Sequence, residues 1–258
     1  MISGAWTADL LEFLLPTGCV VCRTWIPARD TPPIVCAPCR TRLREATWPR
    51  CPRCHHPHGT GRVAAPDCLE CRAWPPELTA ARYAYVLGPP ADDLVHALKY
   101  EGWRELANLM GSAMAAALQG PDSTRPAAAP DRPTIVVPVP TTPRRLKERG
   151  YNQAHLLAER LASLLGLPLR PVLARALAPR SQTSLTPMQR RENVRGAFGP
   201  AAMGLGGVRG AEVLLVDDVL TTGATAAEAA VTLVRAGAAT VTLVAFARAL
   251  PSRPRKAA

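Results

Sequence analysis

The chain has 258 residues, which suits one large domain or two modest ones with a core of their own. Hydrophobic residues make up 48% of it, an ordinary share for a globular protein, and no apolar run approaches the ~18 residues of a membrane span. The apolar stretch at 10–15 is short and has no basic leader before it, so we expect no signal peptide and a cytoplasmic protein.

The net charge of +11 is concentrated in one segment. Residues 144–195 hold 11 Lys and Arg against 3 Asp and Glu, an excess of +8, whereas residues 81–143 carry a charge of −1. A basic block of this kind predicts a phosphate-rich ligand, nucleic acid, or both.

The first 71 residues contain all eight cysteines, arranged as four Cys-x2-Cys pairs: Cys19/Cys22, Cys36/Cys39, Cys51/Cys54 and Cys68/Cys71. Thirteen residues separate the first two pairs and also the last two, which indicates a duplicated unit. Two such pairs supply the four thiolates of a structural zinc site, so we predict two zinc ribbons in tandem. Disulfides are the alternative, and pairing the first with the third and the second with the fourth would also fill two zinc sites.

The ribbons are predicted to be a scaffold or a partner-docking unit. Eight thiolates and two Zn²⁺ would contribute about −4, which turns the formal +2 of residues 1–80 negative and makes a poor nucleic-acid surface. We interpret His55, His56 and His58 as surface residues or residues beside the ligands, because the eight cysteines suffice.

Trp74-Pro75-Pro76 predicts a domain boundary. We therefore expect a double zinc ribbon with a short leading helix at 1–75, a second domain at 76–250 and a disordered basic tail at 251–258. Within the second domain, the Pro- and Ala-rich residues 119–133 predict a flexible loop.

The second domain is predicted to open with a strand at 80–86 and helices at 92–100 and 103–118. Lys99 and Tyr100 end the first of these helices, just before Gly102. They would contact a ligand's phosphate or base, or they would be a helix C-terminal cation and a packed aromatic residue.

A buried strand at 135–137 ends at Pro138-Val139-Pro140 and leads into a basic loop. The loop carries Arg144, Arg145, Lys147 and Arg149, and a helix follows at 153–165. We assign the four cations to a pyrophosphate, because a strand-to-helix loop of a parallel sheet faces the ligand edge. A solvated charge run is the ordinary alternative.

Residues 180–198 are polar and end in a basic stretch, which predicts a flexible lid that would exclude water from a reactive site. We assign Arg190, Arg191 and Asn193 to the lid. A disordered linker is the alternative.

The stretch Val213–Thr225 predicts a buried strand, two acids and a small-residue loop that opens a helix. Asp217 and Asp218 would accept hydrogen bonds from a vicinal diol, and the loop Thr221-Thr222-Gly223-Ala224-Thr225 offers N–H groups at a helix N-terminus to a phosphate. Together they describe a site for a ribose 5-phosphate. A Walker B strand and a purely structural strand are the alternatives, and the first would need a Gly-x4-Gly-Lys-Ser/Thr loop, which the sequence lacks.

This stretch resembles the 5-phosphoribosyl-1-pyrophosphate (PRPP) signature of type I phosphoribosyltransferases. The resemblance implies an α/β fold with a parallel sheet flanked by helices. It implies that Asp217 and Asp218 are catalytic and hold the ribose hydroxyls, that residues 221–225 hold the 5-phosphate, and that Mg²⁺ binds with PRPP.

The wider set of motifs resembles the ComF family of competence proteins. The set comprises the Cys-x2-Cys pairs, residues 97–100, Pro138-Val139-Pro140, residues 149–153, Thr183 with Gln189 and Asn193, and Asp217-Asp218. The resemblance implies a role in DNA uptake during natural transformation, with DNA-uptake proteins as partners. Two other functions stay open: an active phosphoribosyltransferase of nucleotide salvage or synthesis with an unknown acceptor, and a non-catalytic scaffold that binds single-stranded DNA. The sequence is compatible with a dimer.

Overall fold

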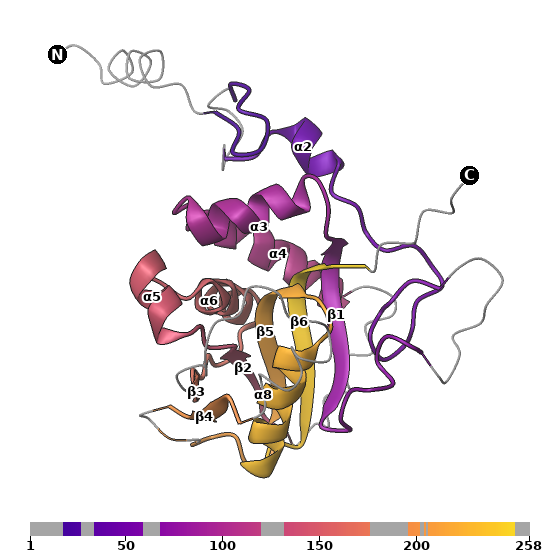
Figure 1. Ribbon diagram of the computed structural model, residues 1–258, viewed down its shortest axis with the longest axis vertical. Helices are drawn as coiled ribbons and strands as arrows, with labels where there is room; N and C mark the ends of the chain where they lie inside the picture. The colour runs from indigo at the N-terminus through magenta and orange to yellow at the C-terminus, as the bar shows by residue number, and fades with distance from the viewer. Residues whose placement is uncertain are drawn as a thin grey trace.

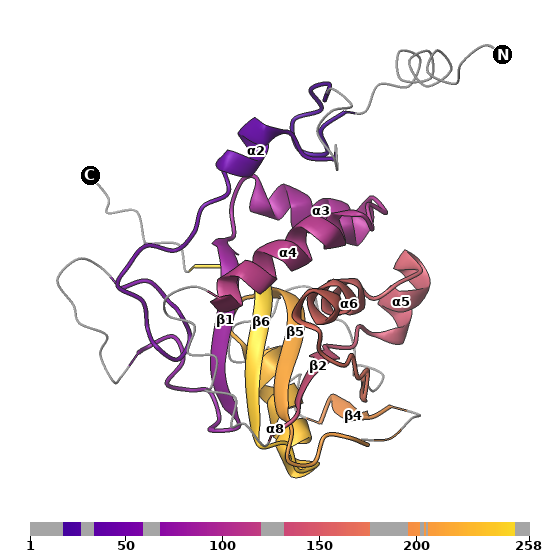
Figure 2. The same ribbon diagram turned by 180° about the vertical axis from the view of Figure 1, so that it is seen from behind.

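A computed structural model describes residues 18–26, 34–58, 68–119, 132–175, 196–201, 204 and 206–250. Its centre is a four-stranded parallel sheet in the order β1-β6-β5-β2, which Figures 1 and 2 show from opposite sides. The strands are β1 (Leu78–Val86), β2 (Thr134–Pro138), β5 (Glu212–Leu220) and β6 (Thr240–Arg248). The predicted α/β fold is confirmed.

Helices cover both faces of this sheet. On one face lie α3 (Ala91–Tyr100), α4 (Leu106–Gln119) and α6 (Gln153–Leu165), and on the other lies α8 (Ala224–Arg235). Successive side chains of a strand point to opposite faces. Accordingly, Leu214 and Val216 of β5 belong to the hydrophobic cluster of α4 and α6, whereas Val213 and Leu215 belong to the cluster of α8. This double coverage explains why the strand sequence is apolar without alternation.

The basic segment after β2 is a short helix, α5 (Pro143–Arg149), and the prediction of a loop was wrong there. The oxygen of the Thr142 side chain accepts a hydrogen bond from the Arg145 N–H at 3.3 Å, and Pro143 occupies the first turn. Both are helix-start signals. Gly150 ends the helix in the left-handed conformation at φ 77°.

A second, two-stranded antiparallel sheet lies beside the main one and consists of β3 (Leu173–Arg175) and β4 (Phe198–Pro200). The residues that connect them, 176–195, are outside the described part of the chain. They include the predicted lid residues Arg190, Arg191 and Asn193. The leading helix, residues 120–131 of the predicted loop and the tail also lie outside it.

Each cysteine segment packs into a different hydrophobic cluster. Cys19, Cys39 and the apolar residues near them join the cluster of α3, α4 and α6, and the segment also forms the short helix α2 (Ala37–Thr41). The four later cysteines and Trp74 join the cluster of α8. Figure 1 shows the first segment next to α3 and the second beside the edge strand β1. The division of the chain at residue 75 stays a prediction.

None of the helices in the described segments combines the length and the apolar character that crossing a membrane requires.

Candidate functional site

The acid pair lies near the carboxyl end of β5, where ligands bind in parallel sheets. Asp218 is only 4% exposed; its Oδ2 forms an ion pair with Lys99 of α3, and its Oδ1 accepts a 3.4 Å hydrogen bond from Gln153 of α6. Asp217 is half-buried, and its Oδ1 accepts a hydrogen bond from the Asp218 N–H at 2.9 Å. Burial, followed by the negative charge of Asp218, raises the pKa of Asp217 well above its usual range. One ammonium group therefore faces two carboxyl groups, and the site favours a further cation.

A cleft of about 400 Å³ opens over these two acids. Its walls come from α3, α5, the start of α6, β3, β5 and the start of α8. The charged, aromatic and hydroxyl side chains among the lining residues that bear on function are Lys99, Tyr100, Arg145, Arg175, Asp217, Asp218, Thr221 and Thr225. Acids, cations and hydroxyl groups thus face one space from five elements.

The predicted phosphate loop connects β5 to α8. Gly223 caps α8 at φ 79°, and the Thr222 hydroxyl accepts a 3.4 Å hydrogen bond from the Ala224 N–H. Thr221 and Thr225 line the cleft with the acids. Thr222 and Ala224 line a neighbouring pocket of about 590 Å³ between Trp74 and α8. The loop therefore separates two hollows and presents the α8 N-terminus beside the acid pair.

The four cations assigned to pyrophosphate are not equivalent. Arg145 lines the cleft. Arg149 donates a 2.8 Å hydrogen bond to Gln153, and its guanidinium lies 4.8 Å from the centre of the exposed Tyr100 ring. Arg144 is exposed and pairs with Glu148 at 2.7 Å, and the exposed Lys147 does not line the cleft. The structure therefore brings Arg145 to the cleft, Arg149 to its rim, and leaves Arg144 and Lys147 outside.

Arg175 is a cleft residue that the sequence analysis missed. It ends β3, lines the cleft and carries its guanidinium 5.3 Å from the centre of the Phe198 ring. Burial, and then the charge of Arg145, lower the pKa of Arg175, while the charge of Asp217 opposes them. The available signal was a basic residue directly after the apolar run 172–174. Asp217 could be located because ligands bind at the carboxyl ends of parallel strands. This rule does not apply to Arg175, because β3 is outside the parallel sheet.

The cysteines form two groups: Cys19, Cys22, Cys36 and Cys39, and Cys51, Cys54, Cys68 and Cys71. Within each group the four sulfur atoms lie within 4.8 Å of one another, for example 3.6 Å between Cys22 and Cys36 and 3.7 Å between Cys54 and Cys68. Tetrahedral zinc with Zn–S bonds of ~2.3 Å has sulfur–sulfur edges of about 3.8 Å, whereas a disulfide needs ~2.05 Å. Both groups can therefore hold zinc, and the structure has the sequential pairing.

The second cysteine group is buried throughout, whereas Cys22 of the first group is exposed. Burial raises the pKa of Cys54 to about 12, although the charge of Arg248 opposes the rise. A buried thiol of this kind ionises when a metal ion displaces its proton.

The three histidines beside these cysteines are not part of either group among the described residues. His55 is buried, and its backbone carbonyl accepts a 2.6 Å hydrogen bond from the Tyr83 hydroxyl. Burial, followed by the charges of three arginines, lowers the pKa of His55 to about 3, so its ring stays neutral. His55 therefore acts as a packing residue between the second cysteine group and β1.

A model of the phosphoribosyl transferase domain family matches residues 152–258, which include α6, β5, α8 and β6. Together with the parallel sheet and its flanking helices, this match defines a domain of the phosphoribosyltransferase type, to which the two cysteine groups are attached.

Relatives then identify the family. The DNA utilization protein YhgH of Salmonella typhi is 32% identical over 238 residues, which span 92% of this chain and 99% of the relative. Competence protein ComFC of Bacillus subtilis (strain 168) is 29% identical over 80% of each chain. Competence protein F of Haemophilus influenzae is 36% identical over 45% of this chain and 51% of the relative. The chain belongs to the ComF family of competence and DNA utilization proteins.

Proposed function

We propose that the cleft binds PRPP together with Mg²⁺, and that the protein acts in DNA uptake. The observation that carries the proposal is the placement of the acid pair and the α8 N-terminus at one cleft. The Thr221–Thr225 loop would bind the 5-phosphate, and Asp217 and Asp218 would bind the ribose hydroxyls. Arg145 and Arg175, which line the same cleft, would bind the pyrophosphate.

The acid pair also fits Mg²⁺, because carboxylate oxygens suit this ion and, within the part of the chain that the structure describes, the pair has one ion-pair partner, Lys99. Asp217 and Asp218 would hold the ion, which would supply positive charge against the pyrophosphate. From the sequence, Lys99 was either a ligand contact or a cation at the C-terminus of a helix. Because Lys99 lines the cleft and pairs with Asp218, we favour the ligand contact.

The role in DNA uptake is supported by the names of the relatives, which refer to DNA utilization and competence. We infer a cytoplasmic protein whose partners belong to the DNA-uptake machinery. Each cysteine group would hold one structural zinc, since all four ligand positions are filled by sulfur.

The same site could transfer the phosphoribosyl group to an acceptor. Asp217 and Asp218 would then orient the ribose, and the pyrophosphate would leave toward Arg145 and Arg175. Release of pyrophosphate from PRPP in the presence of candidate acceptors measures this activity directly.

Calorimetric titration with PRPP, with and without Mg²⁺, tests the binding site. We expect the wild-type protein to bind PRPP in a Mg²⁺-dependent manner and Asp217→Asn/Asp218→Asn to lose the binding. Asp93→Asn is the matched control, because Asp93 is an exposed acid on α3 that does not line the cleft. Normal PRPP binding by the double variant would show that the acids do not form the site.

A second candidate function is binding of single-stranded DNA. One observation favours it: Tyr100 is 63% exposed at the rim of the cleft, with the Arg149 guanidinium against its ring. An exposed aromatic ring beside cations is a stacking surface for bases. Tyr151 offers no such surface, because it is buried and donates its hydroxyl to the Leu98 carbonyl.

A further inference from the structure

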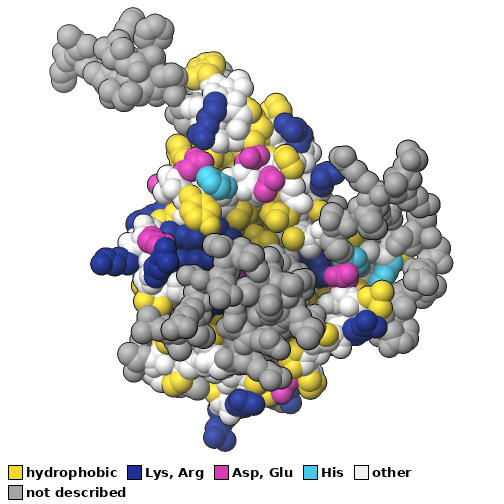
Figure 3. Space-filling model, viewed as in Figure 1, with side chains coloured by type: hydrophobic (Ala, Val, Ile, Leu, Met, Phe, Trp, Pro, Cys, Tyr) yellow, Lys and Arg dark blue, Asp and Glu magenta, His cyan; other side chains and the backbone are white. Residues whose placement is uncertain are grey.

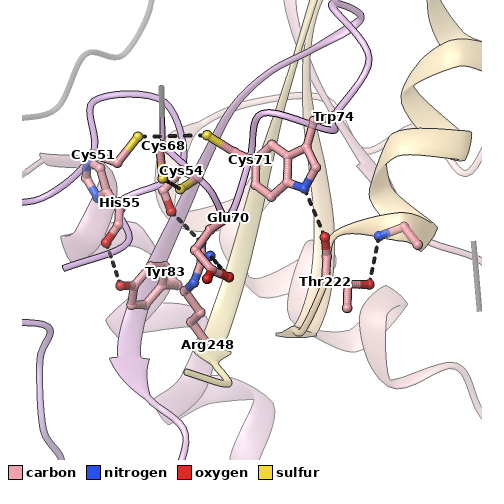
Figure 4. A network of polar contacts seen from close by, with 11 residues as sticks. Cys51, Cys54, His55, Cys68, Glu70, Cys71, Trp74, Tyr83, Thr222 and Arg248 are labelled. Atoms are coloured by element: carbon pink, nitrogen blue, oxygen red, sulfur yellow. Dashed lines mark hydrogen bonds and ion pairs between the residues drawn. The ribbon is translucent and has the colours of Figure 1, made fainter. Parts of the chain in front are cut away.

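The second cysteine group is connected to the phosphate loop through one side chain, Trp74 (Figure 4). Trp74 follows Cys71 by three residues, is 6% exposed, and donates a 2.9 Å hydrogen bond from Nε1 to the Thr222 carbonyl. A Cβ added to Gly223 would lie 2.6 Å from this Nε1. Because Gly223 also has φ 79°, both the close approach of the indole and the turn require glycine there.

The zinc-binding segment fixes the position of Trp74. Arg53 lies between Cys51 and Cys54 and donates hydrogen bonds to the carbonyls of Cys71 at 3.2 Å, Pro75 at 2.7 Å and Leu78 at 2.9 Å. These acceptors lie on both sides of Trp74, so one side chain holds the whole segment.

The same segment is also fixed to the main sheet. Arg248, at the end of β6, donates a 2.6 Å hydrogen bond to the Cys54 carbonyl. The Ala81 N–H of β1 donates a 2.8 Å hydrogen bond to the Arg53 carbonyl. Trp74 is therefore held by a unit with hydrogen bonds to two strands of the main sheet.

The bond to Thr222 sets the orientation of a peptide group. In a trans peptide the C=O and the following N–H point in opposite directions. Since the Thr222 carbonyl points at Trp74, the Gly223 N–H is directed away from it. A phosphate loop works by presenting such N–H groups to the anion, and Thr221 and Thr225 on either side line the cleft.

We propose that Trp74 is a positioning residue for the phosphate loop, through which the second cysteine group keeps residues 221–225 in the orientation that binds a 5-phosphate. The inference rests on the proposed PRPP site for its ligand, but the connection between Trp74 and the loop is independent of it. Trp74 itself lines only the neighbouring pocket and not the cleft of the acid pair.

Trp74→Phe tests the proposal, because it keeps an aromatic ring and removes the N–H donor. Trp48→Phe is the matched control, since Trp48 lies in the same segment and is 51% exposed. Three ligands are titrated by calorimetry with Mg²⁺: PRPP, ribose 5-phosphate and pyrophosphate. A lost neutral hydrogen bond corresponds to an affinity decrease of about three- to tenfold. We expect this decrease for PRPP and ribose 5-phosphate in Trp74→Phe, unchanged affinity for pyrophosphate, and no change in Trp48→Phe.

Hydrogen exchange of the amides at 222–227, measured without ligand, gives a readout that does not depend on the PRPP site. We expect faster exchange in Trp74→Phe than in the wild type and in Trp48→Phe. If the wild type binds none of the ligands but exchange is faster in Trp74→Phe, the proposed function fails and the positioning role stands. Unchanged exchange in Trp74→Phe overturns the positioning role, and so does an equal loss of affinity for all three ligands.

Discussion

Asp218 is the residue at which the polar contacts of the cleft meet. Lys99 pairs with one of its oxygens, Gln153 donates to the other, and Gln153 in turn accepts a hydrogen bond from Arg149. This series joins α3, β5, α6 and the end of α5. A residue from one element can therefore change the charge and the position of groups on three others.

Removing Lys99 should destabilise the protein, because it leaves the Asp218 carboxylate buried without its cation. We expect Lys99→Met to lower the free energy of unfolding by about 3 kcal/mol, the lower end of the cost of breaking a buried ion pair, because the Lys99 side chain is 20% exposed. Urea denaturation at neutral pH measures the change. In Lys99→Met/Asp218→Asn the loss should be smaller, since no buried charge remains. Arg144→Met removes an exposed ion pair and should have no measurable effect. A Lys99→Met variant as stable as the wild type would show that water replaces the ammonium group.

Asp217 predicts a pH dependence with a definite sign. The pKa of Asp217 is raised in the folded state. In the unfolded chain the carboxyl group has its ordinary pKa of ~3.9 and therefore loses its proton at a lower pH. Its contribution to stability is fully present below that value and is lost as pH rises through the raised pKa. We expect Asp217→Asn to match the wild-type Tm at pH 4 and to exceed it at pH 8 in the absence of ligand. A wild-type advantage at pH 8 would mean that the charged form is the stabilised one.

At the scale of the elements, the strands of the parallel sheet and α8 were predictable, because runs such as Val213–Val216 are apolar without alternation and Gly237 follows the helix. The order of strand, acid pair and small-residue loop also predicted that Asp217 and Asp218 lie beside residues 221–225.

The short strand β4 was missed, and its first residue, Phe198, lies in the segment predicted as a lid. The short helix α5 was missed because its turns carry cations in place of an apolar face. The contact between Trp74 and Thr222 joins residues 148 positions apart, and no local pattern encodes such a pair.

The two cysteine groups should differ in how much they stabilise the chain. The second is buried and bonded to β1 and β6, whereas the first has the exposed Cys22. We expect Cys19→Ser/Cys22→Ser and Cys51→Ser/Cys54→Ser each to reduce the zinc content from two to one per chain. The second pair should give the larger fall in Tm, because a zinc site shares its binding free energy with the structure around it. Zinc is quantified by mass spectrometry and Tm by calorimetry.

Equal Tm changes in the two double variants would show that burial in the α8 cluster adds nothing to the second site. Two zinc ions retained in either variant would show that the remaining cysteines or nearby histidines complete the site.

At the scale of the whole molecule, the charge of +11 is unevenly distributed along the chain. Lys and Arg side chains gather around α5 (Figure 3), next to the acids of α3, while the cysteine segments become more negative when zinc binds. The basic segment 144–195 can be found by counting charges along the sequence. The cations that line the cleft cannot be told in this way from those that face solvent, because that division depends on which side of α5 meets the acid pair.

This division allows DNA binding and PRPP binding to be separated. If Arg144, Arg145, Lys147 and Arg149 all contact DNA phosphates, the logarithm of the affinity for single-stranded DNA should fall with the logarithm of salt concentration with a slope of about −2.8. The affinity would then drop about 50-fold between 50 and 200 mM salt. Arg144→Ala/Lys147→Ala changes only the cations outside the cleft. It should halve this slope and leave Mg²⁺-dependent PRPP binding intact.

The matched control is Arg42→Ala/Arg72→Ala, which removes two exposed cations from the cysteine segments. Fluorescence anisotropy with a labelled oligonucleotide measures the slope for each variant. Because zinc makes the cysteine segments more negative, this control should keep the wild-type slope. A reduced slope in the control and an unchanged slope in Arg144→Ala/Lys147→Ala would place the DNA on the ribbons. The cleft would then be left to PRPP alone, and the exposed ring of Tyr100 would have no role in stacking bases.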